Sequence, residues 1–346
     1  MNTKELQESL NSFPYPGLSR TLGELKLISE VKVTENHAHI ELLTVSDDSY
    51  LTLKSAIEGF FSEHFVSMNI TKKSTAKKDM NYGNSISPNN RAPYAANVIA
   101  VTSGKGGVGK STVSVNLAIA LAQKGYRVGI LDADLYGPNI PRLTNTDLEK
   151  IRWNDDNKII PSENYGLKIM SVALTTPTSD TPLVWRSSVA VSALIQFLED
   201  VAWGELDFLV IDMPPGTGDI QLTMAQELPI TAGVIVTTPQ LVASDDVSRA
   251  IRMFQDIHVP MAGLVENMSY FIAPDTGKRY DIFGSGGGER LSQRYNIPLL
   301  GQIPLNMDIR EGSDNGEPPI VLGSDELKSY YREIVENMLT AVKFKI

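Results

Sequence analysis

The sequence predicts an α/β fold in which residues 95–346 build a doubly wound, mainly parallel sheet and a small α+β domain precedes it. Short apolar runs in the second part of the chain alternate with helical patterns, which is typical of parallel strands joined by helical crossovers. A glycine-rich loop connects the first of these runs to an apolar helix. A polar stretch separates both features from the N-terminal part, so the chain divides into two domains.

The small domain comprises residues 1–70. Residues 31–33 and 39–43 predict strands, and residues 51–65 show the periodicity of an amphipathic helix. Residues 71–94 contain few apolar side chains and many turn formers, which predicts a flexible linker between the domains.

The large domain begins with an apolar run that leads into the glycine-rich loop. A buried helix is expected over residues 113–123, because this segment is rich in Ala, Leu and Val. Open parallel sheets bind ligands at the carboxyl ends of their strands. The strands predicted for this sheet are residues 97–102, 127–132, 167–172, 208–212, 233–237, 263–267 and 299–303.

The glycine-rich loop, residues 103–112, fits the phosphate-binding pattern G-x-x-x-x-G-K-[ST]. Glycines let the backbone wrap a phosphate with its N–H groups pointing inward, and the N-terminus of the following helix adds partial positive charge. We expect Lys110 to reach the β- and γ-phosphates and the Ser111 hydroxyl to ligate Mg²⁺. A bare glycine-rich turn is the alternative, but the flanking strand and helix favour a site for a nucleoside triphosphate.

Carboxylates follow two of the predicted strands. Asp132 and Asp134 end the strand that starts at residue 127, and Asp212 ends the strand over residues 208–212. A carboxylate at a strand tip beside the phosphate loop can hold Mg²⁺ directly or through water, and a second one can orient the attacking water. The alternative is that these aspartates only cap loops. Gly216 and Gly218 follow Asp212 and let the backbone move when the γ-phosphate is lost.

The composition excludes several classes of protein. The formal net charge of −10 over 346 residues argues against a protein that coats nucleic acid or an anionic membrane. The N-terminal residues lack the pattern of a signal peptide, and no apolar run approaches the roughly 20 residues that span a bilayer, so we expect a cytoplasmic protein. The chain contains no cysteine, which excludes disulfides and thiolate metal ligands.

Several motifs of this sequence resemble those of a known family of ATPases. The loop GKGGVGKS, with its additional Lys105, resembles the deviant Walker A motif of the MinD/ParA group of ATPases. DADLYGPNIP, DFLVIDMPPGTGDIQLT, VTTPQLVASDDVSRA, ENMSYF, FGSGGGERL and LLGQIPLNMDIRE resemble the Mrp/ApbC family over residues 96–321. The N-terminal residues resemble, more weakly, the small domain often fused ahead of these ATPases. The resemblance implies a homodimeric Mg²⁺-dependent ATPase that hydrolyses ATP slowly and helps iron–sulfur clusters reach apo-proteins. Its partners would be assembly factors or client proteins, with no nucleic acid and no membrane.

The resemblance also implies roles for individual residues. Lys105 would cross the dimer interface to the γ-phosphate bound by the other subunit, in the manner of an arginine finger. Asp134 would position the attacking water with Asp132 in support, and Asp212 would lie in the outer shell of the Mg²⁺ ion. The implied nucleotide site consists of Gly104, Lys105, Gly106, Gly107, Val108, Gly109, Lys110, Ser111 and Thr112 at the phosphates, with Asn267, Pro304 and Asp308 at the adenine.

One departure from the family concerns the cluster itself. Many members carry a C-x-x-C pair after ENMS, and the equivalent positions here hold Ala273 and Thr276, neither of which can replace a thiolate. The N-terminal domain lacks the cysteine expected near residues 44–47, and WRSS at residues 185–188 departs from the family's W-R-G-P. Two other functions therefore stay open: an ATP-switched adaptor that recruits assembly partners without holding a cluster, and a MinD/ParA-like positioning ATPase.

Three further segments have two interpretations each. His37 and His39 share one face of a strand and indicate either a polar sheet face or part of a metal site. Residues 284–289 are either a second anion cradle or a turn that enters a helix, with Ser285 near its N-cap. The helical segment 325–342 either packs against the sheet or a partner, or anchors the protein to a membrane; its glutamates favour packing.

Overall fold

A computed structural model of the chain describes residues 1–14, 21–23, 27–34, 36–43, 47–62, 64–72, 91–134, 137–175 and 187–345. The chain forms two compact units, one built from the residues up to Ser85 and one built mainly from Ile86 onward. Most of the predicted linker, residues 73–90, lies outside the described residues, as do the family positions 44–46 and 185–186.

The N-terminal unit is a three-stranded sheet with two helices: α1 (Thr3–Asn11), β1 (Ile28–Thr34), β2 (His37–Leu42), α2 (Asp47–Phe61) and β3 (Ser67–Lys72). β2 lies in the centre, antiparallel to β1 and parallel to β3. Asn2 and Glu5 form a capping box that starts α1. The helix expected over residues 51–65 ends four residues earlier, because the chain turns there to enter β3.

Alternation along β2 separates the two faces of this sheet. Ala38, Ile40 and Leu42 are buried in the core of the unit, whereas His37 and His39 lie on the opposite face. The His37 Nδ1 atom is 2.7 Å from the Ser67 hydroxyl. Among the described residues no group of three metal-ligating side chains occurs. His37 is exposed and His39 half-buried, which agrees with a polar sheet face.

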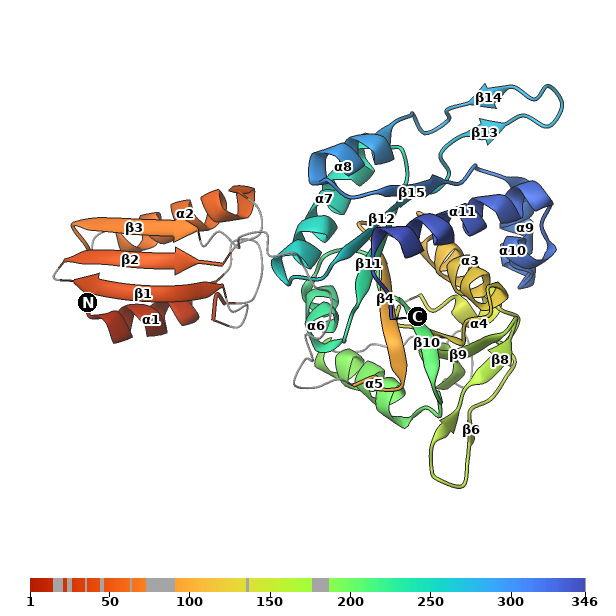
Figure 1. Cartoon of the computed structure of the whole chain (residues 1–346), viewed down its shortest axis with the longest axis horizontal. Helices are drawn as coiled ribbons and strands as arrows, with labels where there is room; N and C mark the ends of the chain where they lie inside the picture. Colours follow the sequence, from red (N-terminus) through yellow and green to blue (C-terminus); the bar gives the residue numbers. More distant parts are fainter. Residues whose placement is uncertain are drawn as a thin grey trace. The chain divides into compact units, whose positions relative to one another are not determined.

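The second unit contains an eight-stranded sheet in the order β15-β12-β11-β4-β10-β5-β9-β8 (Figure 1). Only the edge strand β8 runs antiparallel to its neighbour, so the predicted mainly parallel α/β fold is confirmed. The strands of this sheet are β4 (Ala95–Ser103), β5 (Val128–Asp132), β8 (Ser162–Asn164), β9 (Leu167–Ser171), β10 (Leu206–Asp212), β11 (Ala232–Thr237), β12 (Met261–Glu266) and β15 (Leu299–Gln302).

Helices cover both faces of the sheet, and two short hairpins project from it (Figure 1). The hairpins are β6 (Arg152–Trp153) with β7 (Ile159–Ile160), and β13 (Phe271–Ile272) with β14 (Arg279–Tyr280). The helices are α3 (Lys110–Gln123), α4 (Ile140–Leu143), η1 (Val172–Thr175), α5 (Ser187–Asp200), α6 (Asp219–Glu227), α7 (Leu241–Asp256), α8 (Gly287–Tyr295), α9 (Met307–Asn315), α10 (Pro319–Leu322) and α11 (Asp325–Ala341).

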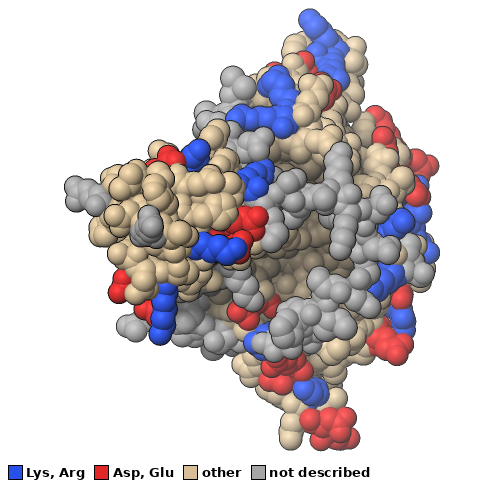
Figure 2. Space-filling model, turned by 60° about the vertical axis from the view of Figure 1, so that its left-hand side comes forward, with Lys and Arg blue, Asp and Glu red and all other residues tan. Residues whose placement is uncertain are grey.

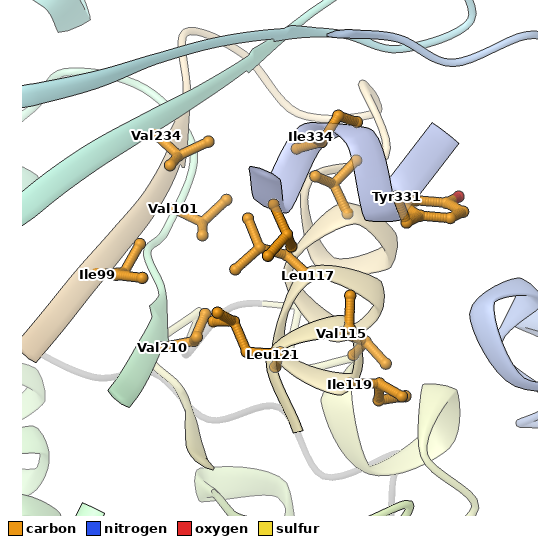
Figure 3. Close-up of a cluster of buried hydrophobic side chains, with 14 of the residues drawn as sticks. Ile99, Val101, Val115, Leu117, Ile119, Leu121, Val210, Val234, Tyr331 and Ile334 are labelled. Atoms are coloured by element: carbon orange, nitrogen blue, oxygen red, sulfur yellow. The ribbon is translucent and has the colours of Figure 1, made fainter. Parts of the chain in front are cut away.

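The main core lies between the sheet and the pair α3 and α11 (Figure 3). Val234 of β11 joins this core, whereas the next residue, Ile235, packs on the opposite face with α7 and α8. Leu117 and Leu121 of α3 are almost fully buried, and each contributes about 2 kcal/mol to stability by leaving water. Burial of α3 on several sides fixes the loop that precedes it.

The apolar face of the C-terminal helix, α11, is buried in the core of the second unit. Tyr331, Ile334 and Met338 of α11 are buried against α3 and β15. The chain beyond α11 returns to the sheet, where the Asn97 side chain donates to the Lys345 carbonyl oxygen and accepts from its N–H group, at 2.8 and 2.9 Å. Packing against the sheet is thus the correct interpretation of this segment. In the described part of the chain, every helix is too short or too polar to cross a bilayer.

Candidate functional site

The phosphate loop connects β4 to α3, as the pattern predicts. Gly107 and Gly109 both adopt φ of +79°, a conformation that glycine tolerates and other residues avoid. A Cβ atom at Gly109 would also lie 2.2 Å from the Asn267 Nδ2 atom, and one at Gly104 would lie 2.4 Å from the Val247 nitrogen. Local conformation and close packing therefore explain why these loop positions hold glycine.

A buried charge cluster lies at the start of α3. The Lys110 Nζ atom is 2.8 Å from Asp212 Oδ2 and 3.6 Å from Asp134 Oδ2. β10 lies between β4 and β5, so the carboxyl ends of β10 and β5 bring both aspartates next to the loop. The side chains of Lys110 and Asp212 are only 6% and 0% exposed. The structure thus places one lysine and two strand-tip carboxylates in one site.

Two hydroxyl groups of α3 complete the surroundings of Asp212. Ser111 donates to Asp212 Oδ2 at 2.6 Å, and Ser114 donates to Oδ1 at 2.7 Å. Ser114 was not among the site residues predicted from the sequence, although it lies four residues after Lys110 and so on the same side of the helix. A hydroxyl beside a carboxylate is a donor set of hard oxygen atoms, which suits Mg²⁺.

Asp132 is fully buried and supports the neighbouring chain. Its carboxylate accepts from the Asp134 N–H group at 3.2 Å, and from the Ile140 N–H group and the Ser171 hydroxyl, both at 3.1 Å. Burial, together with the negative charge of Asp212, raises the pKa of Asp132 well above the ordinary value of an aspartate. Sequence reasoning missed Ser171, which reaches the site only because β9 lies beside β5.

Lys105 lies at the other end of the loop. Its ammonium group donates to Gln240 Oε1 at 3.0 Å, and its carbonyl oxygen accepts from the Ser103 hydroxyl at 2.8 Å. Gln240 is also absent from the residues predicted for the site. The structure thus gives Lys105 a partner within its own subunit.

The three residues expected at the adenine occupy different surroundings. Asn267 follows β12 and donates from Nδ2 to the Val108 carbonyl oxygen at 2.8 Å, so it contacts the phosphate loop directly. Pro304 is buried after β15. Asp308 is exposed in the first turn of α9, where its N–H group donates to Asn306. Of these three residues, the structure joins Asn267 to the phosphate loop through a hydrogen bond.

The glycine-rich turn before α8 is filled by a carboxylate of the protein. The N-cap of α8 is Gly286, one residue after Ser285. Glu266 is fully buried and accepts from the Gly288 N–H group at 2.5 Å through Oε2. Its other oxygen accepts from Ser269 and Gln302. An internal anion therefore occupies this helix N-terminus, and the turn is a helix entry.

The positions that correspond to the family's cysteine pair lie in the β13–β14 hairpin. Ala273 donates through its N–H group to the Lys278 carbonyl oxygen at 3.0 Å and accepts from the Gly277 N–H group at 2.8 Å. Ala273 is 9% exposed and Thr276 is exposed. A methyl group and an alcohol do not fit an iron–sulfur cluster, which prefers thiolate ligands.

The chain is similar to known P-loop proteins over its second unit. Residues 94–339 match the ParA family model described as NUBPL iron-transfer P-loop NTPase. The chain belongs to this family. The description as a P-loop NTPase agrees with the phosphate loop between β4 and α3 and with the mainly parallel sheet.

Curated relatives extend the match beyond the ATPase unit. The iron–sulfur cluster carrier protein of Aquifex aeolicus is 46% identical over 257 residues, which cover 74% of this chain and 71% of the relative. The protein of the same name from Escherichia coli strain K12 is 39% identical over 335 residues, 95% of this chain and 89% of the relative. The second likeness therefore includes most of the N-terminal unit.

Solved structures agree with the fold. A nucleotide-binding protein of Archaeoglobus fulgidus in complex with ADP is 37% identical, with a TM-score of 0.61, and covers 70% of this chain and 94% of its own. The cell division ATPase MinD of Pyrococcus furiosus, at 21% identity and a TM-score of 0.53, covers 71% of this chain and 99% of its own, and shares the fold.

Proposed function

We propose that this chain is a slow, homodimeric ATPase whose nucleotide state controls its part in iron–sulfur cluster assembly or transfer to apo-proteins. The observation that carries the proposal is the position of Lys110, buried at the end of a phosphate loop between the strand-tip carboxylates of Asp134 and Asp212. Membership of the iron-transfer P-loop NTPase family and relatives named iron–sulfur cluster carriers support the role in cluster assembly.

Each charged residue has a defined task in ATP hydrolysis. Lys110 would exchange part of its contact with the carboxylates for the β- and γ-phosphates of ATP. Asp134 would orient the attacking water, held in place by the contact of its backbone with buried Asp132. Ser111 and Asp212 would hold Mg²⁺, which neutralises charge on the phosphate oxygens when bound. Lys105 would supply a second positive charge to the γ-phosphate of the partner subunit.

Nucleotide recognition away from the phosphates is proposed for Asn267, Pro304 and Asp308. Asn267 uses its amide nitrogen on Val108, which leaves the amide oxygen Oδ1 for the adenine edge. Pro304 and Asp308 follow β15, the strand beside β12, and would cover the base. Replacing Asn267 by Ala tests this assignment, since it would weaken ATP binding and leave the binding of inorganic triphosphate less affected.

The absence of cysteine favours a second candidate function. With Ala273 and Thr276 at the cluster positions, the chain supplies no thiolate of its own. In this alternative the protein is an ATP-switched adaptor that binds assembly partners without holding a cluster. Any cluster on the dimer would then need ligands from another molecule.

Anaerobic reconstitution distinguishes the two candidates. Iron and sulfide content and the visible spectrum would be measured with and without ATP and glutathione, for the natural chain and for the double variant Ala273→Cys, Thr276→Cys. A chromophore in the variant alone supports the adaptor, because the hairpin then accepts a cluster only when thiolates are supplied. A stoichiometric cluster on the natural chain supports the carrier with borrowed ligands.

The positioning ATPase is the weaker alternative. The apolar face of α11 is buried in the unit, and the Lys345 carbonyl oxygen accepts from Asn97 of β4, so that face is not available to bind a membrane. On the face shown in Figure 2, Lys and Arg stand in separate groups among Asp and Glu. Sedimentation with anionic liposomes or DNA in the presence of ATP tests this alternative, and co-sedimentation would revive it.

A further inference from the structure

The second lysine of the phosphate loop is held by a neutral group. Lys105 donates from Nζ to Gln240 Oε1 at 3.0 Å, and both residues are partly buried. Gln240 lies in the short connection between β11 and α7, far from Lys105 in the sequence. An amide oxygen accepts a hydrogen bond from an ammonium group but does not neutralise its charge.

No carboxylate among the described residues forms an ion pair with Lys105. α7 packs closely against the loop and carries Asp246: a Cβ atom at Gly104 would lie 2.5 Å from the Asp246 carbonyl carbon. The Asp246 carboxylate is instead paired with Arg249. Among the described side chains, Lys105 is therefore held by a neutral acceptor rather than by a carboxylate.

The segment that carries Gln240 is fixed on its other side. A Cβ atom at Gly287, the first residue of α8, would lie 2.6 Å from the carbonyl oxygen of Pro239. The loop at Gly104 and the start of α8 thus both lie in close contact with the elements around residues 239–247. Gln240 is presented to Lys105 by a tightly packed part of the structure.

We propose that Gln240 is a positioning residue that holds Lys105 within its own subunit in the resting state. Lys105 reaches the γ-phosphate of the partner subunit only after this hydrogen bond is broken. The bond thereby sets the protein concentration at which ATP-bound subunits form an active dimer. This inference rests on the proposed function, in which Lys105 acts across the dimer interface.

Two substitutions at Gln240 should act in opposite directions. Gln240→Leu removes the acceptor at similar volume, so Lys105 is released more easily. Gln240→Glu adds a charge and holds Lys105 more tightly. A hydrogen bond to a charged group corresponds to a change of about tenfold in an equilibrium constant. Because a symmetrical dimer needs two Lys105 side chains released, the protein concentration for half-maximal specific ATPase activity should fall by about tenfold to a hundredfold for Leu and rise for Glu.

The assay is ATPase activity per subunit over a wide range of protein concentration, with the dimer fraction measured by sedimentation. The Lys105→Ala, Gln240→Leu double variant should behave as Lys105→Ala alone, because Gln240 acts through Lys105. The inference would be overturned if the half-maximal protein concentration shifted in the same direction for Gln240→Leu and Gln240→Glu, or shifted for neither. It would also be overturned if the effect of Gln240→Leu persisted in the Lys105→Ala background. Melting temperature identifies a merely structural effect, which would lower stability in both backgrounds.

The proposed function fails in a different way. If specific activity of the natural chain does not depend on protein concentration, or if Lys105→Ala retains full activity, the dimer mechanism itself is wrong. If the natural chain does show this concentration dependence and Lys105→Ala does lose activity, but the Gln240 variants behave as the natural chain, only the role of Gln240 is wrong.

Discussion

Replacing Lys110 by Met should remove nucleotide binding and also destabilise the ATPase unit. Lys110 is the cation that pairs with Asp212 and Asp134, and Asp212 is fully buried. Met keeps the apolar stem of the side chain but leaves the carboxylates without their cation. The variant therefore loses stability because the carboxylates are uncompensated, and it loses nucleotide binding because the contact with the phosphates is gone.

The size of the stability effect follows from burial. Removing one partner of a buried ion pair costs about 3–5 kcal/mol. Ser111 and Ser114 still donate to Asp212, so we expect the lower end of this range. A change of about 1 kcal/mol shifts the melting temperature of a domain of this size by about 2–4 °C, so a decrease of about 6–12 °C is expected.

The assay combines calorimetric ATP and ADP binding with thermal unfolding. Lys110→Met, Asp212→Asn should recover most of the lost melting temperature, because the uncompensated carboxylate is gone, and nucleotide binding should stay lost. Lys124→Met is a matched control at the exposed pair with Glu336, where a change below about 1 kcal/mol is expected. An unchanged melting temperature for Lys110→Met, or no recovery in the double variant, would refute the reasoning.

Three further predictions concern single positions. Gly109→Ala should weaken ATP binding in a calorimetric titration, because a φ of +79° strains any residue with a side chain and the added methyl group would displace the Asn267 amide from the loop. Tyr331→Phe should leave the melting temperature unchanged or raise it, since the buried Tyr331 hydroxyl has no hydrogen-bond partner among the described residues; a loss of more than about 1 kcal/mol would contradict this. Gly59→Ala in α2 should raise the stability of the N-terminal unit by about 0.5–1 kcal/mol in denaturant unfolding, because a Cβ atom there meets nothing within 4 Å.

Local patterns explain which parts of the fold could be predicted. The strand at residues 208–212 and the helix at 113–123 are continuous apolar segments, and both lie within the observed β10 and α3. The short strands β8 and β13 went unpredicted, because three or two residues give no periodicity. The first helix, α1, also went unpredicted: it is short and mostly polar, and its signals are a capping box and the pair Leu6 and Leu10.

The sequence by itself determined the phosphate loop, the strand-tip carboxylates and the parallel α/β class, because each depends on residues that are neighbours along the chain. Only the tertiary structure decided which strands lie side by side. That order brings Asp212 of β10 into contact with both Lys110 and Ser114 of α3. The same holds for the bond between Lys105 and Gln240, and for Glu266 at the start of α8. These contacts join residues far apart in the sequence, and the order of strands in a sheet leaves no mark on the periodicity of any one strand.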